Sequence, residues 1–303
     1  MCGPIARIRH EVIYHSGGHS PDGWAIHGRR RMSSPDALRT IKVNRAAELL
    51  LWSRNNHTRL QGLPPDLIPR DLEEAYGIQA AVMSLRGSQL AGFKLGLTNE
   101  KAQRAADTFA PIVGRLAAND VYRGSARIAL PEKHLRIVEA EIVFELGSDL
   151  PAGHAPYSEQ RVLASVARAF AGIEVCNTRF EETVEPSLPC LVADNSNADL
   201  IVVGDPLPER DLAALADLAV TLQRRGHPDI QGTTRNVLGN PLRALTWLAN
   251  WLARRGEGLK RGQLISSGSC TGMTELSADD SAVATFGSGA RVSLELSVAS
   301  ARK

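Results

Sequence analysis

Residues 136–146 read RIVEAEIVFEL, and this stretch decides the fold because it predicts a β-strand with two unlike faces. Side chains of a strand alternate between its two faces. One face is wholly apolar, with Val138, Ala140, Ile142, Phe144 and Leu146. The other face carries Glu139, Glu141, Val143 and Glu145. The question raised by such a strand is what its carboxylates bind.

Glu139 and Glu141 are two residues apart, which places them on the same face with backbones about 7 Å apart. Two negative charges at about 6 Å repel by roughly 2–3 kcal/mol at an intermediate dielectric. A sheltered pair therefore needs a proton or a cation between its members. The alternative for a Glu-x-Glu pair taken alone is a strand face in contact with water.

A third carboxylate favours the cation. Glu174 stands in FAGIEVCN (170–177), with apolar residues on both sides, where an unpaired buried charge costs several kcal/mol. Three carboxylates without a histidine or thiolate partner suit a hard ion. We expect Glu139, Glu141 and Glu174 to hold Mg²⁺ or Mn²⁺.

A lysine stands alone in a second expected strand. AGFKLGLT (91–98) alternates, with Gly92, Lys94, Gly96 and Thr98 on one face. Lys94 could simply point to solvent, but the two flanking glycines let a ligand or another backbone come close. Beside a metal site, such a cation would bind a substrate carboxylate or serve as a tuned acid or base. Both uses imply a small acidic substrate.

The segment SSGSCTG (266–272) follows another expected strand and supplies hydroxyl groups and glycines. A turn held by Ser and Thr hydrogen bonds is favoured over direct ligand contact. It lacks the Gly-Lys-Ser/Thr end of a phosphate-binding loop, and the chain has neither a nucleophile elbow with suitable partners nor a dinucleotide-binding glycine motif after a strand. Serine hydrolysis and dinucleotide binding are therefore unsupported.

Composition narrows the class of protein. The chain has 303 residues, 43% of them hydrophobic, which allows one large core or two modest ones. Lys and Arg total 35 against 33 Asp and Glu, so no nucleic acid or acidic membrane is indicated as a partner. Apolar runs are too short to span a membrane. Four cysteines without CxxC spacing indicate neither zinc nor a disulfide scaffold, and a reducing cytoplasm fits best.

The order of patterns predicts an α+β fold. Residues 1–40 are rich in turn residues, and we expect a flexible tail, with Met32 as an alternative start. Helices are expected at 44–54 and 69–87, in a helical N-terminal lobe spanning 41–90, and further on at 159–170 and 240–256. Short strands that are not evenly interleaved with helices indicate a curled, mixed sheet in a catalytic unit spanning 91–303.

Several motifs together resemble the fumarylacetoacetate hydrolase superfamily. They are GFKLGLT, VEAEIVFEL, GIEVCNTRF, LVADN, GNPLRALTWLANWLA and GQLISSGSCTG, in this order between about Ala46 and Ser297. Within that superfamily the chain resembles 2-keto-4-pentenoate (2-hydroxypenta-2,4-dienoate) hydratases and 2-oxo-3-hexenedioate decarboxylases. The resemblance implies a helical N-terminal part followed by a mixed β-roll.

The resemblance also implies roles for particular residues. Glu139, Glu141 and Glu174 would hold Mg²⁺ or Mn²⁺, Lys94 would be the strand lysine of the site, and Asp194, Asn195 and Ser269 would lie near the substrate. A metal-dependent hydratase of aromatic catabolism would add water to a 2-hydroxy-2,4-dienoate. A homo-oligomer is implied, and a pathway aldolase or decarboxylase is a possible partner.

Four alternatives to the hydratase stay open. The same metal-assisted enolate chemistry would serve a 2-oxo-3-hexenedioate (4-oxalocrotonate) decarboxylase, and Ile112 stands in APIVGRL where hydratases commonly have an acidic residue. A C–C bond hydrolase would need a His/Glu pair, for which the chain between Lys94 and Glu141 offers only His134. An inactive partner subunit is a third alternative, which the intact Lys94 and glutamates disfavour. A biosynthetic enzyme acting on another enolisable substrate is the fourth.

Overall fold

The computed structural model describes residues 35–132 and 134–299. The tail expected at 1–40 lies mostly outside this part of the chain. Its last six residues do not belong to a tail, because helix α1 (Pro35–Asn55) already begins at Pro35. Proline is well tolerated at the first helical position, where its missing N–H leaves no bond unmade, and Asp36 places a negative charge in the first turn.

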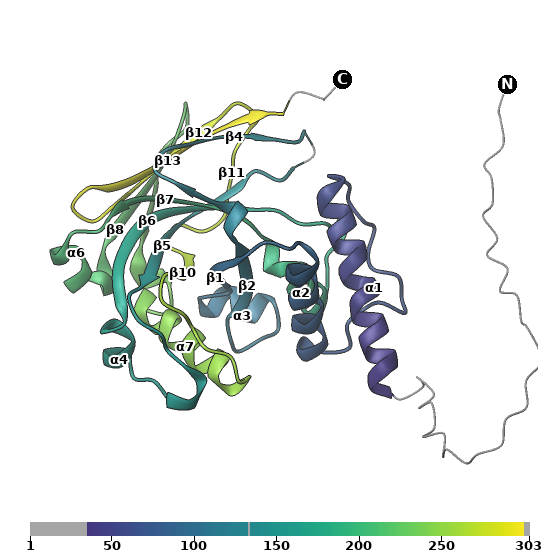
Figure 1. Ribbon diagram of the computed structural model, residues 1–303. Coiled ribbons are helices and arrows are strands. Elements are labelled where there is room, and N and C mark those ends of the chain that lie inside the picture. Colours follow the sequence, from purple (N-terminus) through teal and green to yellow (C-terminus); the bar gives the residue numbers. More distant parts are fainter. Residues whose placement is uncertain (1–34, 133, 300–303) are drawn as a thin grey trace, which may run out of the picture.

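Two sheets form the body of the described part of the chain (Figure 1). The larger has eight strands: β1 (Leu90–Gly96), β2 (Ile112–Ala117), β3 (Val121–Arg123), β5 (Ile137–Leu146), β6 (Val166–Cys176), β7 (Ala198–Pro206), β10 (Leu264–Ser269) and β11 (Thr274–Glu275). The smaller has five: β4 (Ala126–Leu130), β8 (Ala219–Arg224), β9 (Ile230–Thr233), β12 (Ser281–Phe286) and β13 (Ala290–Val298).

Strand order places sequence-distant segments side by side. The larger sheet runs β2-β1-β10-β5-β6-β7-β3, with β11 paired to β5, and the smaller runs β4-β13-β12-β8-β9. Parallel and antiparallel pairs occur in both sheets, so each sheet is mixed. Strand β13 packs against β6 and β7, which brings the two sheets together over the main core. The α+β prediction with a curled mixed sheet is confirmed.

Helices flank the sheets. Besides α1 they are α2 (Leu72–Leu85), α3 (Glu100–Ala105), α4 (Glu159–Leu163), α5 (Leu188–Ala193), α6 (Glu209–Ala213) and α7 (Pro241–Arg254). Short 3₁₀ turns are η1 (Ala118–Asp120), η2 (Ala152–His154), η3 (Asn195–Asn197), η4 (Leu215–Asp217) and η5 (Thr234–Asn236). Helices α1 and α2 pack side by side at one flank, and α7 lies against β10 (Figure 1).

Helix α7 shows why the sequence folds this way locally. Asn240 caps its N-terminus by accepting a hydrogen bond from the Leu242 amide, and Pro241 takes the first helical position. Leu245, Leu248 and Leu252 then recur at helical spacing and are fully buried. The amphipathic pattern therefore fixes which face of α7 covers the sheet.

The prediction of a single helix over 159–170 is wrong. Helix α4 ends at Leu163 and β6 begins at Val166, so the second half of that segment is strand. Alanine-rich stretches such as ASVARAFA satisfy either periodicity, and the pairing of β6 with the whole length of β5 decides between them. This strand carries Glu174, and its length is what brings Glu174 opposite β5.

The two glycines beside Lys94 have different neighbours, and at Gly92 the neighbour is the backbone of another strand. A Cβ on Gly92 would lie 1.8 Å from the carbonyl oxygen of Leu264 on the parallel neighbour β10. Gly92 therefore admits another backbone and not a ligand. At Gly96, by contrast, the nearest atoms are side-chain carbons of Ile112 at 3.1 and 3.4 Å and Lys94 Nζ at 3.8 Å.

We expect Gly92→Ala to lower the free energy of unfolding by about 3 kcal/mol or more, because the added methyl must push β1 and β10 apart. Urea unfolding followed by circular dichroism measures this. Gly153→Ala is the matched control, since a Cβ there meets nothing within 4 Å. Equal stability of the two variants would contradict the close approach of the strands.

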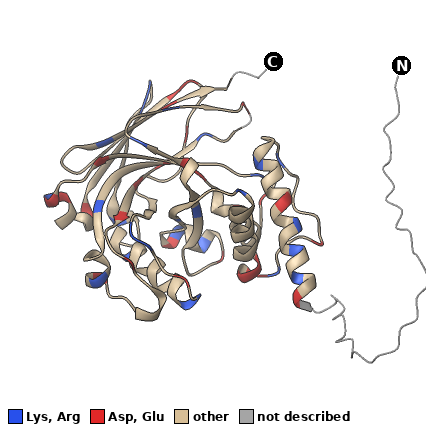
Figure 2. Ribbon diagram, viewed as in Figure 1, with Lys and Arg blue, Asp and Glu red and all other residues tan. Residues whose placement is uncertain are grey.

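Figure 2 shows Lys and Arg interspersed with Asp and Glu over helices and strands. Among residues 35–132 and 134–299, no helix combines the length and the apolar character required to cross a bilayer. The division into a helical lobe at 41–90 and a catalytic unit at 91–303 remains a proposal, and β1 starts at its boundary.

Candidate metal and substrate site

The side chains of the expected site come from the adjacent strands β1, β10, β5 and β6. Glu139 on β5 is directly opposite Glu174 on β6, Glu141 follows Glu139 on the same face, and Lys94 on β1 pairs with Ser266 on β10, which in turn pairs with β5. Neighbouring strands are about 4.8 Å apart. The register thus places three carboxylates and one ammonium group together.

Glu141 is held in place from β10. Its Oε2 accepts a hydrogen bond from the Ser266 hydroxyl at 2.5 Å and from the Gly268 amide at 2.8 Å. The pairing of β10 with β5 shifts register between Ser266 and Ser269, which turns the Gly268 amide toward the carboxylate. Gly268 has φ +108°, and a Cβ there would lie 2.1 Å from the Thr98 hydroxyl oxygen. Only glycine fits this position.

The carboxylates keep oxygen atoms free for a ligand. Glu141 and Glu174 are fully buried, and among the described residues neither Glu141 Oε1 nor either oxygen of Glu174 has a hydrogen-bond partner. Lys94 Nζ lies 3.2 Å from Glu174 Oε1, an ion pair without the angles of a hydrogen bond. Buried oxygens that lack partners are costly, so the arrangement fits a bound cation.

Charge leads to the same conclusion. Three ionised carboxylates and one ammonium sum to −2, which one divalent ion balances. Burial raises the pKa of Glu174 to about 7, with Lys94 opposing the rise and Glu139 adding to it. Burial also raises the pKa of Glu141, and the charges of Glu174 and Glu139 act in the same direction. Burial and mutual repulsion thus disfavour the ionised forms of Glu174 and Glu141, and a bound cation would oppose that effect.

Lys94 keeps its charge in this setting. Burial alone would lower its pKa, but the surrounding acidic groups, led by Glu174, raise it above the usual value. The side chain is 4% exposed, so it has little access to bulk water. Lys94 is therefore an ammonium group, suited to hold a carboxylate.

Cys176 was missed by the sequence reasoning. Its Sγ donates to Glu139 Oε2 at 3.6 Å, and one ligand atom each from Glu139, Glu174 and Cys176 lie within 4.8 Å of one another. The signal was present, because Cys176 follows Glu174 by two residues and so shares its face. Burial raises the pKa of this thiol, as do the charges of Glu174 and Glu139. Cys176, Cys190 and Cys270 are all free thiols.

Ser269 lies at the end of β10, opposite Glu141 in the strand register. Its hydroxyl oxygen is buried and has no hydrogen-bond partner among the described residues. Residues 266–269 belong to strand β10, so the turn expected over 266–272 can only follow Ser269. Ser266, which the sequence analysis did not single out, is the residue that contacts a carboxylate of the cluster.

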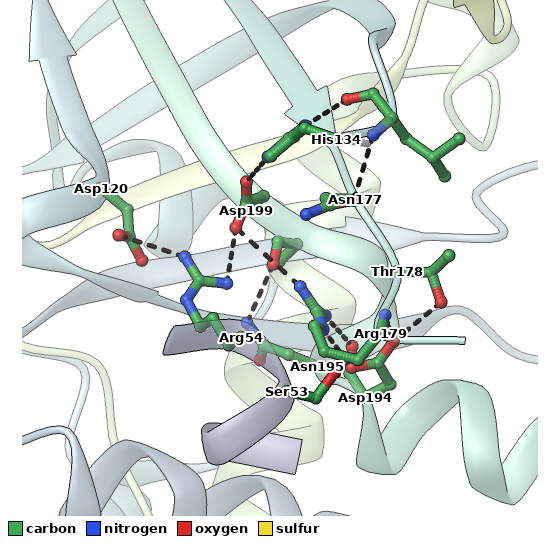
Figure 3. Close-up of polar contacts among 12 residues, drawn as sticks. Ser53, Arg54, Asp120, His134, Asn177, Thr178, Arg179, Asp194, Asn195 and Asp199 are labelled. Carbon is green, nitrogen blue, oxygen red and sulfur yellow. Dashed lines mark hydrogen bonds and ion pairs between the residues drawn. The ribbon is translucent and has the colours of Figure 1, made fainter. Parts of the chain in front are cut away.

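Asp194 is not free to face a substrate. One carboxylate oxygen accepts from the Thr178 hydroxyl at 2.9 Å and from the Arg179 amide at 2.8 Å, and the other accepts from the Arg179 guanidinium (Figure 3). Burial raises the pKa of Asp194, and the charge of Arg179 opposes that rise. Its polar atoms are thus used to hold Arg179.

Asn195 connects this ion pair to the site. Its side chain accepts from the Arg115 amide and donates to the Arg115 carbonyl, which joins η3 to β2. A Cβ on Gly114 would lie 2.6 Å from the Asn195 carbonyl oxygen and 3.0 Å from Lys94 Cγ. The segment after Asp194 therefore lies against the stem of Lys94.

His134 belongs to the same polar network as Arg179 and Asp194, to which Asp199 links it (Figure 3). Its Nε2 lies 2.5 Å from Asp199 Oδ2, and its Nδ1 faces the Leu135 carbonyl. Asp199 also pairs with Arg54 of α1 at 2.5 Å, which joins this helix to β7 of the sheet. Arg179 lies between Asp199 and Asp194 and pairs with both. Both nitrogens of His134 are engaged there, which disfavours a His/Glu pair for a C–C bond hydrolase.

Residues 84–302 match the sequence profile of the fumarylacetoacetate (FAA) hydrolase C-terminal family. The chain belongs to this family. The match covers well over half of the chain and begins at the end of α2. The family resemblance read from the motifs is thereby confirmed.

Relatives within the family share most of the chain. It is 30% identical to the TodF product hydratase of Pseudomonas putida over 82% of this chain and 93% of that one. It is 32% identical to a 2-keto-4-pentenoate hydratase of Paraburkholderia xenovorans over 71% and 79%. A 4-oxalocrotonate decarboxylase of Pseudomonas putida G7, complexed with magnesium and adipate, superposes with a TM-score of 0.77 at 25% identity, covering 84% and 97%.

We expect Asp194→Asn to lower the free energy of unfolding by about 3–5 kcal/mol, because it removes the carboxylate that the buried Arg179 hydrogen-bonds and leaves the more distant Asp199, at 3.9 Å, to balance its charge. Thermal and urea unfolding measure this. Asp66→Asn, which removes an exposed ion pair with Arg45, should cost less than about 1 kcal/mol. If Asp194→Asn unfolds like wild type but loses all activity, Asp194 has a direct role in the reaction and not a supporting one.

Proposed function

We propose that the protein is a metal-dependent hydro-lyase that adds water to a 2-hydroxy-2,4-dienoate and forms a 4-hydroxy-2-oxo acid. The observation that carries this proposal is the cluster of three carboxylates beside Lys94, in which Glu141 and Glu174 have buried oxygens without hydrogen-bond partners among the described residues. The similarity to two named hydratases supports the choice of reaction. A small acidic substrate suits a site with one ammonium group and room for a divalent ion.

Glu139, Glu141 and Glu174 would hold the ion, and oxygen ligands suit Mg²⁺ or Mn²⁺. When bound, the ion supplies a Lewis acid that polarises the carboxylate and the 2-oxygen of the substrate. Ser266 and the Gly268 amide hold Glu141 in one orientation, so the ligand set is preorganised. Glu141 therefore needs no reorientation when the substrate binds.

Lys94 would orient the substrate by donating hydrogen bonds to its carboxylate or would pass a proton during ketonisation. Ser269 offers a hydroxyl without a partner in the described structure, suited to a substrate oxygen. Asp194 would act as a positioning residue, because it holds Arg179 while the carbonyl oxygen of the adjacent Asn195 and the Cγ atom of Lys94 both lie beside Gly114. Water then adds at C4 of the conjugated 2-oxo-3-enoate, whose carbonyl withdraws electrons through the double bond.

The setting of this activity is also proposed. A dienoate of this kind arises in the catabolism of aromatic rings, and a cytoplasmic location is part of the proposal. Homo-oligomeric assembly and association with a pathway aldolase or decarboxylase remain predictions. A 4-hydroxy-2-oxo acid is a substrate for aldol cleavage, so an aldolase is the partner that the product chemistry favours.

Decarboxylation of 2-oxo-3-hexenedioate is the second candidate, and Ile112 favours it. Ile112 is 3% exposed, and its Cγ1 lies 3.1 Å from the Cβ position of Gly96, which is itself 3.8 Å from Lys94 Nζ. An apolar side chain therefore stands near Lys94, where an acidic residue is common in hydratases. The overall structural similarity to a decarboxylase supports the same alternative.

Two assays separate the candidates. Purified protein with Mg²⁺ or Mn²⁺ is mixed with 2-hydroxypenta-2,4-dienoate, and loss of the dienol absorbance reports hydration. The same protein with 2-oxo-3-hexenedioate is assayed for released CO₂. An unchanged dienol trace with both metals, together with CO₂ release, would replace the hydratase by the decarboxylase.

We expect Glu174→Gln to lower metal-dependent turnover by about 100-fold or more, since it removes one charge from the ligand set. Steady-state kinetics at saturating Mg²⁺ measure this. Glu145→Gln is the matched control, because Glu145 is on the same face of β5 at its far end and is partly exposed. Comparable losses in both variants would argue that the charge of the strand face as a whole matters, and not the ligand position.

We expect Mg²⁺ affinity to fall as pH is lowered through about 7, because the pKa of Glu174 is about 7 and its proton then competes with the ion. Above that pH the Glu174 carboxylate is already ionised, so its proton no longer competes with the ion. The decline is up to about tenfold per pH unit for each proton displaced. Isothermal titration calorimetry from pH 6 to pH 8 in two buffers measures both affinity and proton release, and a flat profile would contradict the prediction.

A further inference from the structure

The thiol of Cys176 adds a different kind of ligand to the acidic site. Cys176 comes from the last position of β6 and is 5% exposed. Its Sγ, one oxygen of Glu139 and one oxygen of Glu174 lie within 4.8 Å of one another. A metal site of carboxylates alone does not use this sulfur.

The spacing fits direct coordination. In a tetrahedral site with bonds of about 2.3 Å to sulfur and about 2.0 Å to oxygen, these two ligand atoms are about 3.5 Å apart. Cys176 Sγ and Glu139 Oε2 are 3.6 Å apart. One ion between them can therefore reach both atoms with little movement of either side chain.

A second observation, independent of the thiol, indicates a ligand at this position. Both oxygens of Glu174 and one of Glu141 are buried and lack hydrogen-bond partners among the described residues. Glu174 is opposite Glu139 and two residues before Cys176, and one of its oxygens lies within 4.8 Å of the sulfur and of a Glu139 oxygen. A cation there would satisfy the oxygens and the sulfur together.

We propose that Cys176 is a metal ligand that makes the site bind thiophilic divalent ions, such as Zn²⁺, Cd²⁺ and Co²⁺, through Glu139, Glu174 and Cys176. This rests on the proposed function only in using the same acidic cluster. Thiolate ligands favour these ions, whereas Mg²⁺ and Mn²⁺ favour oxygen. On binding, the metal–sulfur bond forms and the thiol proton passes to the buffer, with no change of oxidation state. Zn²⁺ at this position would displace Mg²⁺ and inhibit the enzyme.

Binding of Co²⁺ or Cd²⁺ to metal-free protein tests this, because a thiolate ligand produces a charge-transfer absorption in the ultraviolet that carboxylates do not. We expect the band in wild type and its disappearance when excess Mg²⁺ competes for the carboxylates. Cys176→Ser and Cys176→Ala should lack the band. Cys190→Ser is the control and should keep it, since Cys190 is a buried free thiol on α5, outside the acidic cluster.

Calorimetry supplies the second readout. We expect Cys176→Ser to weaken Zn²⁺ binding by about 100-fold while Mg²⁺ binding changes by less than about threefold. Absence of the band in wild type, or equal losses of Zn²⁺ and Mg²⁺ affinity in the variant, would overturn the proposal. The hydratase assay with Mg²⁺ is independent of these outcomes. A wild-type band without hydratase activity would sink only the proposed function, and activity without a band would sink only the thiol ligand.

Discussion

The pairing of β5 with β6, which sets Glu139 opposite Glu174, is the constraint on which the site depends. Like charges directly opposite on a sheet destabilise it, and here a third carboxylate, Glu141, shares their face. The backbone ladder of two long strands offsets that cost. Lys94 offsets part of the charge, and the remaining charge suits a divalent ion.

The scaffold keeps this costly arrangement in one geometry. The opposite face of β5 is packed into the main core, so the strand cannot slip by one residue without moving five apolar side chains out of that core. Ser266 and Gly268 hold Glu141 from β10, and Gly92 lets β1 come close enough to deliver Lys94. The ion pairs around Arg54 and Asp199 fasten the N-terminal helices to the same sheet.

Membership of the fumarylacetoacetate hydrolase family and the geometry of the cluster agree in chemical terms. Enolisable 2-oxo acids need a cation at their carboxylate and 2-oxygen, and the cluster offers both a place for a divalent ion and an ammonium group. Hydration and decarboxylation share this requirement. Ile112 lies near Lys94, with its Cγ1 3.1 Å from the Cβ position of Gly96 and that position 3.8 Å from Lys94 Nζ.

The sequence by itself determined the α+β class, the family, the strand 136–146 with Glu139 and Glu141 on one face, and the strand around Lys94, because periodicity and motifs are local properties. Only the tertiary structure decided that 166–170 is strand, that Ser266 holds Glu141, that Cys176 joins the acidic cluster and that Asp194 is occupied by Arg179. Those outcomes depend on strand register and on partners far apart in the chain. A local pattern specifies the face on which a side chain lies, whereas pairing between strands specifies what that side chain meets.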